Sequence, residues 1–270
     1  MLRVTAPNPS LETLAGTNSY VVGGGSGGCV VIDPGPPHAA HQDRLAAFAE
    51  RRGGARAILI THGHADHAGG AAALRARTGA PIHAFSALHV PDADRLLRDG
   101  EELRIGDVSI VALYTPGHCA DHLCFYLPER RVLFAGDLTA GQGTVFIAPP
   151  DGDLAAYLAS LRRVSVLSVR RIFPGHGPTI ARPAALLHGY LAHRAEREAQ
   201  ALAALAGRER SMEELIDTGY PDIEPARRRL AALQLAALLR KLETEHRVTV
   251  RRDADGRSRW RGDPKHDHQE

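Results

Sequence analysis

The segment at residues 61–67, THGHADH, constrains the fold and chemistry of this chain more than any other. It places three imidazoles and one carboxylate within six consecutive positions, directly after the apolar run at residues 57–60. Such groups at the end of a strand are the ligands that a borderline divalent cation such as zinc prefers. Four of them are too many for one cation that also keeps an open coordination position. The segment therefore predicts two metal ions that share a loop, and paired metals indicate hydrolytic chemistry.

A two-metal site needs further ligands, and three more strand-like runs each end in a residue of a ligand type. These residues are His118 after residues 108–115, Asp137 after residues 132–135, and His176 after residues 171–173. Each lies beside glycine or proline, as expected where the backbone turns sharply and approaches an ion closely. One such residue alone is ordinarily a surface or hydrogen-bonded group. Four strand ends that all carry ligand types favour a shared metal centre.

Other catalytic motifs are missing from the sequence. No G-x-S-x-G nucleophile elbow is present. The glycine-rich residues 23–28 lack the Lys-Ser/Thr ending of a phosphate-binding loop, and their place between two valine-rich runs predicts a hairpin turn. Hydrolysis without a serine or cysteine nucleophile is therefore the expected chemistry.

Length and composition predict a folded, non-membrane protein. The chain has 270 residues with 44% hydrophobic residues, enough for a core, and a formal net charge of +2, too small to force a polyanionic partner. No run of 18 apolar residues is present, so no membrane span is expected. The three cysteines form no C-x-x-C pair and no signal region is evident, which predicts reduced thiols and a cytoplasmic location.

Strand and helix patterns alternate through the first two thirds of the chain, which predicts a layered α/β domain. Strands are expected at residues 19–22, 29–32, 57–60, 81–84, 108–113, 123–127, 132–134 and 171–173, and helices at residues 40–52, 70–78 and 154–164.

The last third of the chain has a different composition. A long alanine- and leucine-rich helix is expected at residues 184–206, ended by Gly207. Ser211 and Glu214 have the spacing of a capping box that opens a short helix. A second strong helix follows at residues 226–245, and two short strands flank the turn at residues 253–256. This order of helices and hairpin is that of a winged-helix-like domain.

The winged-helix-like segment is also basic. Residues 226–262 hold eleven Arg or Lys and four Asp or Glu. A basic helix with a basic hairpin favours contact with nucleic acid such as RNA. The alternatives are that the arginines only solvate a helix face, or that the helices and hairpin cap a pocket or build a homodimer.

Taken together, these ligand-type residues resemble the motifs of the metallo-β-lactamase superfamily, over about residues 10–190. Asp33, at the end of the run at residues 30–32, resembles that superfamily's first motif. A closer likeness is to the β-lactamase-like protein 2 subgroup. It depends on residues 16–20, 115–118 with 121–122, 141–145 and 174–178. Gly63 departs from this subgroup, which often carries a bulky aromatic residue there.

The resemblance implies a four-layer αβ/βα sandwich and a set of residue roles. One metal is expected on His62, His64 and His118, and the other on Asp66, His67 and His176, with Asp137 bridging both. Zinc is the expected metal, and iron and manganese are alternatives. Asp66 and Asp137 are expected to take part in catalysis. Asp33 is expected to support the ligands from behind. For His122 two interpretations stay open, a residue that shapes the pocket and a hydrogen-bonded core histidine.

These inferences combine into one expected organisation and function. The catalytic domain is expected at residues 1–183, the linking helix at 184–207, the winged-helix-like domain at 208–262 and a polar tail at 263–270. The expected activity is that of a binuclear hydrolase that uses a metal-bridging hydroxide on a small ester, thioester or lactone. Cleavage of single-stranded RNA and β-lactam hydrolysis are alternatives. A nucleic-acid-binding protein with a vestigial metal site is an alternative from another class.

Overall fold

The computed structural model describes residues 1–263. Of the expected polar tail at residues 263–270, all but Asp263 lies outside the described residues.

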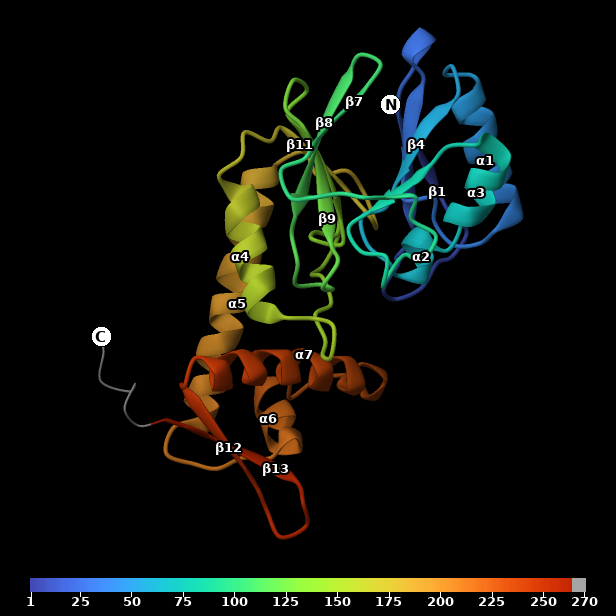
Figure 1. Cartoon of the computed structure of the whole chain (residues 1–270). Helices are drawn as coiled ribbons and strands as arrows, with labels where there is room; N and C mark the ends of the chain where they lie inside the picture. Colours follow the sequence, from blue (N-terminus) through green and yellow to red (C-terminus); the bar gives the residue numbers. More distant parts are fainter. Residues whose placement is uncertain (264–270) are drawn as a thin grey trace.

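Two mixed β-sheets lie face to face in the larger part of the molecule (Figure 1). Within residues 1–263, the first sheet has the order β1-β2-β3-β4-β5-β6, with strands β1 (Leu2–Thr5), β2 (Asn18–Gly23), β3 (Cys29–Ile32), β4 (Ala55–Leu59), β5 (Ile82–Ala84) and β6 (Arg95–Leu96). The second has the order β11-β10-β9-β8-β7, with strands β7 (Glu102–Ile105), β8 (Val108–Tyr114), β9 (Leu123–Leu127), β10 (Val132–Gly136) and β11 (Arg171–Pro174). Each sheet joins antiparallel hairpins to parallel strands, such as β3 with β4 and β10 with β11.

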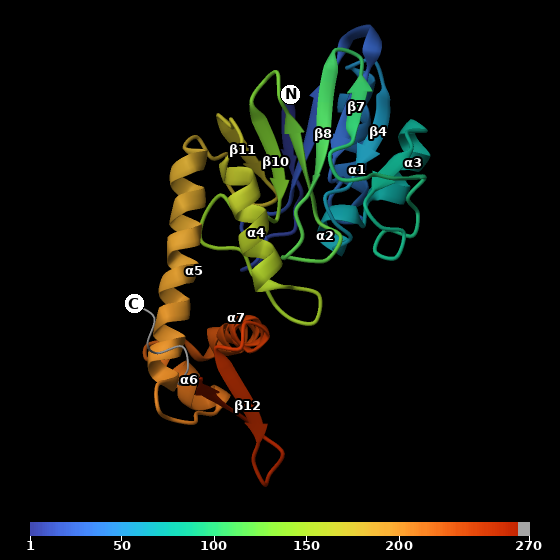
Figure 2. The same cartoon turned by 60° about the vertical axis from the view of Figure 1, so that its left-hand side comes forward.

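Helices cover the outer face of each sheet (Figures 1 and 2). Helices α1 (Ala39–Glu50) and α3 (Ala71–Thr78) lie on the first sheet, and α4 (Leu154–Ser165) and α5 (Pro183–Leu205) lie on the second. Successive strand residues point to opposite faces. In β3, Val30 therefore packs between the two sheets and Val31 packs against α1. Because both faces of β3 are covered, its sequence is apolar throughout. The predicted four-layer sandwich is confirmed.

A helical module with a β-hairpin follows the sandwich. It consists of α6 (Met212–Gly219), α7 (Pro225–Thr244) and the antiparallel strands β12 (Val248–Arg252) and β13 (Ser258–Gly262). The predicted capping box opens α6. The Ser211 hydroxyl accepts from the Glu214 amide at 3.2 Å, and the Ser211 amide donates to the Glu214 carboxylate at 2.7 Å. The predicted winged-helix-like arrangement is confirmed.

Helix α5 belongs to both parts of the molecule (Figure 2). Its first half packs beside α4 through Leu187 and Tyr190, and its second half contributes Ala201 and Leu205 to the same hydrophobic cluster near α6 and α7. Although α5 has 23 residues, none of the described helices is long and apolar enough to cross a membrane.

The regular elements missed by the sequence patterns are short. The edge strands β1, β6 and β7 have two to four residues each, and β6 is exposed along its whole length. The helix α2 (Ala65–Ala68) has one turn and lies inside the THGHADH segment. The predicted hairpin turn at residues 23–28 connects β2 to the antiparallel β3 and contains the 3₁₀ turn η1 (Gly25–Gly27).

Candidate metal centre

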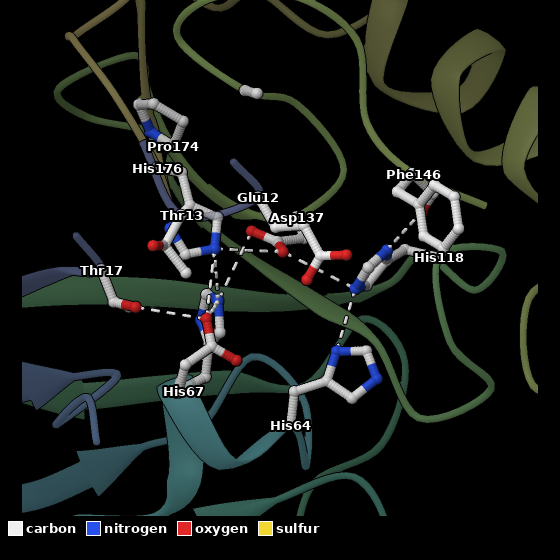
Figure 3. A network of polar contacts seen from close by, with 12 residues as sticks. Glu12, Thr13, Thr17, His64, His67, His118, Asp137, Phe146, Pro174 and His176 are labelled. Atoms are coloured by element: carbon white, nitrogen blue, oxygen red, sulfur yellow. Dashed lines mark hydrogen bonds and ion pairs between the residues drawn. The ribbon is translucent and has the colours of Figure 1, made fainter. Parts of the chain in front are cut away.

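All seven ligand-type residues meet at one edge of the sandwich, where strands of both sheets end. Figure 3 shows His64, His67, His118, Asp137 and His176 of this set. The loop after β4 carries His62 and His64, and α2 carries Asp66 and His67. The other three follow strands of the second sheet, namely His118 after β8, Asp137 after β10 and His176 after β11.

Three imidazoles form the first group of ligand-type atoms. His64 Nδ1 lies 2.9 Å from His62 Nε2 and 3.0 Å from His118 Nε2. His62 is fully buried and His64 is exposed, so this group faces solvent on one side.

Two imidazoles and one carboxylate form the second group. His67 Nε2 and His176 Nε2 lie 3.2 Å apart. Asp66 Oδ2 lies 3.4 Å from the former nitrogen and 3.3 Å from the latter. Both histidines are buried, and Asp66 is held from the other side by the Thr17 hydroxyl, which donates to its Oδ2 at 3.2 Å.

Asp137 lies between the two groups and contacts both. Its Oδ1 is 3.5 Å from His67 Nε2, and its Oδ2 is 3.3 Å from His176 Nε2 and 3.6 Å from His118 Nε2. One carboxylate therefore faces the ligand atoms of both groups, which is the geometry that a bridging ligand requires.

The hydrogen bonds around His62 determine which of its ring nitrogens is bare. The Thr61 hydroxyl lies 2.7 Å from Asp33 Oδ2, a carboxylate that can only accept, so its proton points there. The Thr61 oxygen must then accept from His62 Nδ1, 3.0 Å away. In the neutral His62 ring, Nε2 is left as a lone pair directed at the first group.

His118 is oriented in the same way by the backbone. Its Nδ1 lies 2.8 Å from the carbonyl oxygen of Phe146, which can only accept, so Nδ1 carries the proton and Nε2 of the neutral ring is bare. The bare nitrogens of His62 and His118 both face His64 Nδ1, which has at most one proton to give. At most one proton is therefore available to three imidazole nitrogens that face one another, which leaves lone pairs that a cation can bind. The first group therefore fits a metal ion.

Asp33 and His122 both contact residues of the ligand set. Asp33 Oδ2 accepts from His67 Nδ1 at 2.8 Å, in addition to the Thr61 hydroxyl. His122 is fully buried, and burial lowers its pKa to about 3, so the ring is neutral. Its Nδ1 pairs with the Thr115 hydroxyl at 2.9 Å, and its Nε2 accepts the backbone N–H of Asp137 at 3.0 Å. His122 is thus a hydrogen-bonded core histidine, and it also holds the backbone of Asp137.

The second group is balanced by protons when no cation is bound. Burial by itself would raise the pKa of Asp137, but the charges of His67 and His176 outweigh it and hold that pKa well below its usual range. Burial likewise opposes protonation of the two histidines, yet the carboxylates raise the pKa of His176 to about 9 and that of His67 well above its usual value. A hydrogen bond from His176 overcomes burial and lowers the pKa of Asp66 to about 2. Without a metal ion, the protonated rings of His67 and His176 thus supply the positive charge that a bound cation would supply.

Gly63 is required by a close approach of the chain. A Cβ atom at this position would lie 2.5 Å from the carbonyl oxygen of His89, so the loop that carries His89 leaves no room for a side chain. The amide of Gly63 donates to Asp121 Oδ2 at 2.8 Å, which fixes the loop between His62 and His64. This local contact therefore explains the glycine at position 63, where the β-lactamase-like protein 2 subgroup often carries a bulky aromatic residue.

Three partners in the site were missed by reasoning from sequence. Thr17 and Thr61 contact Asp66 and Asp33 through their hydroxyls, and Phe146 contributes only its carbonyl. Thr61 directly precedes the first ligand, so its position next to the motif was a usable signal. No side-chain pattern marks a backbone carbonyl such as that of Phe146.

Comparison with known families decides the identity of this centre. A family model described as the metallo-beta-lactamase superfamily matches residues 13–176, which is more than half of the chain. The chain belongs to the metallo-β-lactamase superfamily. A second model, the beta-lactamase associated winged helix domain, matches residues 211–260. The chain thus combines a metallo-β-lactamase domain with a winged-helix domain, and the fold implies a divalent metal at the His/Asp cluster.

Similar curated proteins carry several different names. A beta-lactamase-like protein 2 homolog from Caenorhabditis elegans is 32% identical, over 88% of this chain and 82% of its own length. Lactamase-like protein vrtG from Penicillium aethiopicum is 34% identical over 76% of this chain, and an atrochrysone carboxyl ACP thioesterase from Aspergillus fumigatus is 32% identical over 76%. The matches span just under two thirds of the two fungal proteins, at 65% and 64% of their lengths.

Solved structures share the fold. A metallo-beta-lactamase family protein from Thermus thermophilus superposes with a TM-score of 0.77 at 24% identity, over 97% of both chains. TTHA1623, solved in a di-iron-bound form, is 29% identical with a TM-score of 0.57 and covers 70% of this chain and 98% of its own. The first likeness extends through the winged-helix domain, whereas the second covers less of the chain.

The metallo-β-lactamase centre opens into a large pocket of about 1110 Å³. Asp66, His118, Asp137 and His176 line it. Its walls reach across the 142–146 loop to helices of the winged-helix domain, and many of its side chains there are apolar, such as Leu215, Leu230, Leu235 and Leu238. The winged-helix domain is therefore part of the wall of the active-site pocket.

Proposed function

We propose that the protein is a binuclear metal-dependent hydrolase that cleaves esters or thioesters. The observation that carries this proposal is the position of Asp137, whose two oxygens face two separate groups of ligand-type atoms. One ion would be held by His62, His64 and His118, the other by Asp66, His67 and His176, and Asp137 would bridge them.

Zinc is the metal proposed for both positions. The imidazole-rich donor set suits zinc, and iron and manganese are the alternatives that the same ligands accept. When bound, such ions would supply a lowered pKa for water and polarisation of a substrate carbonyl, the two effects that hydrolysis needs.

The chain's own residues have separate proposed roles. Asp33 fixes His67 directly and His62 through Thr61, so one carboxylate orients a ligand in each group. The neutral ring of His122 fixes the backbone of Asp137. Asp66 is ionised at neutral pH because, against the effect of burial, a hydrogen bond from His176 lowers its pKa to about 2, so its Oδ2 can serve as a ligand beside His67 and His176.

The pocket supports a substrate with a sizeable acyl part. Ligand pockets typically have volumes of about 300–1,000 Å³, and the pocket here, at about 1110 Å³, exceeds what a small ester needs. Its apolar wall suits the hydrocarbon or aromatic part of an acyl group better than a phosphodiester chain. Similarity to a protein named as an acyl carrier protein thioesterase is consistent with a thioester.

Ion pairs in the winged-helix domain weaken the alternative of RNA cleavage. Within the described chain, six of the eleven basic residues at 226–262 are paired with Asp or Glu, namely Arg227, Arg228, Lys241, Arg247, Arg251 and Arg259. Phosphate contacts need free cationic groups, because affinity comes from the counterions that they release. We therefore propose a small-molecule thioester or ester as the substrate. The homodimer stays a prediction, which sedimentation of the purified chain tests.

The proposal is tested by metal analysis and a substrate panel on one preparation. Protein never exposed to chelator should hold about two ions per chain. It should hydrolyse acyl thioesters or esters faster than lactones, a chromogenic β-lactam or single-stranded RNA, with Asp137→Asn as the inactive control. One ion or fewer, with no second site on titration, contradicts the binuclear centre. RNA cleavage that exceeds thioester hydrolysis contradicts the proposed substrate.

A cytoplasmic location is proposed on separate grounds. Cys29, Cys119 and Cys124 are buried free thiols, as is common in reducing compartments. Fractionation of the cells that make the protein tests this location.

A further inference from the structure

The segment at residues 140–146, which borders the pocket, depends on side chains from elsewhere for its hydrogen bonds. It contains no helix or strand, so its carbonyls lack partners within a regular element. The Tyr190 hydroxyl lies 2.8 Å from the carbonyl of Gly143 and 3.2 Å from that of Ala140. One turn further along α5, Arg194 donates from its guanidinium to the carbonyl of Val145 at 2.7 Å. Helix α5 therefore holds this segment in place.

The winged-helix domain takes part in the same contact. Gln234 of α7 accepts from Arg194 at 3.0 Å through its amide oxygen, and its amide nitrogen donates to the same Val145 carbonyl at 3.3 Å. A hydrogen bond from a charged donor is roughly twice as strong as a neutral one. Arg194 is thus the main support of the Val145 carbonyl, and Gln234 directs it.

The next carbonyl along the chain is the one that orients His118. Phe146 accepts from His118 Nδ1 at 2.8 Å, so the peptide held by Arg194 directly precedes the carbonyl that aims a ligand-type imidazole (Figure 3). Only the two backbone dihedrals of Phe146 separate these carbonyls, because peptide units are planar. The neighbouring side chains of Val145 and Ile147 are buried, which limits the movement of the segment further.

We propose that Arg194 and Gln234 are positioning residues for His118, and that they act through the backbone of Val145 and Phe146. This inference rests on the proposed role of His118 as a metal ligand. It gives the winged-helix domain a function in the metal centre itself, because Gln234 belongs to α7 and lies in the wall of the pocket. The first group of ligands is then completed only when the sandwich and the winged-helix domain are docked together.

Metal affinity provides a test that does not depend on activity. Metal-depleted full-length protein is titrated with zinc against a competing chromophoric chelator, and with Co²⁺ followed by its visible absorption. Arg194→Met and Gln234→Leu keep the bulk of each side chain but remove its hydrogen bonds. Arg194→Met should weaken one of the two metal sites by about 10–100-fold, the usual effect of losing support behind a ligand. Gln234→Leu should weaken the same site by less, and the other site should keep its affinity in both.

Arg197→Met is the matched control. Arg197 lies on the same helix and also ties α5 to the winged-helix domain, by donating to the Gly219 carbonyl at 3.2 Å. Its other contacts are with Tyr220 and Gln200, not with a residue of the 140–146 segment. Loss of general stability should be similar in Arg194→Met and Arg197→Met, as measured by urea unfolding. Metal affinity should fall only in the former.

A double-mutant cycle with His118→Ala separates positioning from a general structural role. If Arg194 acts through His118, then Arg194→Met adds no further loss of metal affinity once His118 is replaced. Additive losses, or an Arg194→Met protein whose two affinities lie within twofold of wild type, overturn the inference while the proposed function stands. A wild-type protein that takes up no second ion overturns the proposed function, and this inference with it.

Discussion

Asp33→Asn is the substitution whose effect the structure allows to be worked out most fully. Asp33 has a φ of 49°, in the left-handed region, where Asn is tolerated better than most residues. Its oxygens accept from the Thr61 amide at 2.8 Å, the Thr61 hydroxyl at 2.7 Å and His67 Nδ1 at 2.8 Å. Whichever way the new amide turns, its NH₂ group meets a donor. The variant therefore changes the hydrogen bonds and the charge while it keeps the backbone.

The expected magnitude follows from these contacts. In the better orientation the Asn oxygen serves His67 and the Thr61 hydroxyl, and its NH₂ faces the Thr61 amide. The Thr61 amide then loses its acceptor and faces a second donor, so at least one buried donor is unpaired, which costs at least about 1–3 kcal/mol of the free energy of unfolding. Weakened support of the metal ligands should lower metal affinity and kcat/KM by about 10–100-fold, equivalent to about 1.4–2.7 kcal/mol. Asp33→Ala should lose at least as much, because it also strains the backbone.

Three measurements check this reasoning. Chelator competition gives the metal affinity, urea unfolding of the metal-free protein gives the stability, and kcat/KM is taken with an ester or thioester that wild type cleaves. Thr61→Val should weaken metal binding only at the first group, because the Thr61 hydroxyl connects Asp33 to His62. Asp43→Asn, an exposed aspartate that pairs with Arg77, should match wild type in all three. The reasoning is refuted if Asp33→Asn keeps wild-type metal affinity and turnover.

Five other outcomes are expected. Asp137→Ala should lower kcat/KM by orders of magnitude and reduce the bound metal measured by elemental analysis, because it removes the carboxylate shared by both groups of ligands. A variant that keeps the wild-type metal content would contradict the proposed bridging role of Asp137. Metal uptake by the metal-free protein at pH 7 should release roughly one to two protons, because the pKa of His67 is raised and that of His176 is raised to about 9, which keeps both rings protonated at that pH. Metal affinity should therefore rise with pH up to about 9. Calorimetry in buffers of different ionisation enthalpy measures the number of protons released. The stability that these protons give the metal-free protein should be complete below pH 6.5 and should fall as the pH rises through about 9. Gly63→Ala should destabilise the protein by about 1–3 kcal/mol in thermal or urea unfolding, because its Cβ would meet the backbone of His89 at 2.5 Å. If the winged-helix domain does bind RNA, RNA affinity should fall steeply as the salt concentration rises. The slope of affinity against salt should flatten when alanine replaces Arg251, Arg252, Arg257 and Arg259. Wild-type RNA affinity that is weak at low salt excludes this role.

The long strands and the ligand set could be predicted because each leaves a pattern in the sequence. Strands such as β3 and β9 are runs of apolar residues bounded by glycine or proline, and the structure has β3 and β9 at their predicted residues. The proposed ligands follow the ends of four other predicted strands, β4, β8, β10 and β11, so proximity to a strand end along the chain reports proximity in space. The short strand β6 is exposed and contains one arginine and one leucine, so no periodicity marks it.

Long-range supports of the site could not be predicted for a different reason. Arg194 lies 49 residues from Val145 along the chain, and their contact depends on how α5 packs on the second sheet. Phe146 acts through a carbonyl that every residue has, so its side chain carries no signal. The basic character of the winged-helix segment was visible in the sequence. The neutralisation of Arg251 by Glu209 was not, because it depends on tertiary contact.

The shared helix α5 has a consequence for how the molecule unfolds. One continuous hydrophobic cluster extends from Leu133 in the second sheet, through Leu187 and Leu205 of α5, to Leu239 of α7 and Val248 of β12. Neither side of α5 can melt without exposing apolar surface that belongs to the other. Heating should therefore give a single calorimetric transition, with equal van't Hoff and calorimetric enthalpies. A chain cut after Gly207 would leave part of a continuous core open to water and prone to aggregate, so the two parts are separate in shape but one unit in folding.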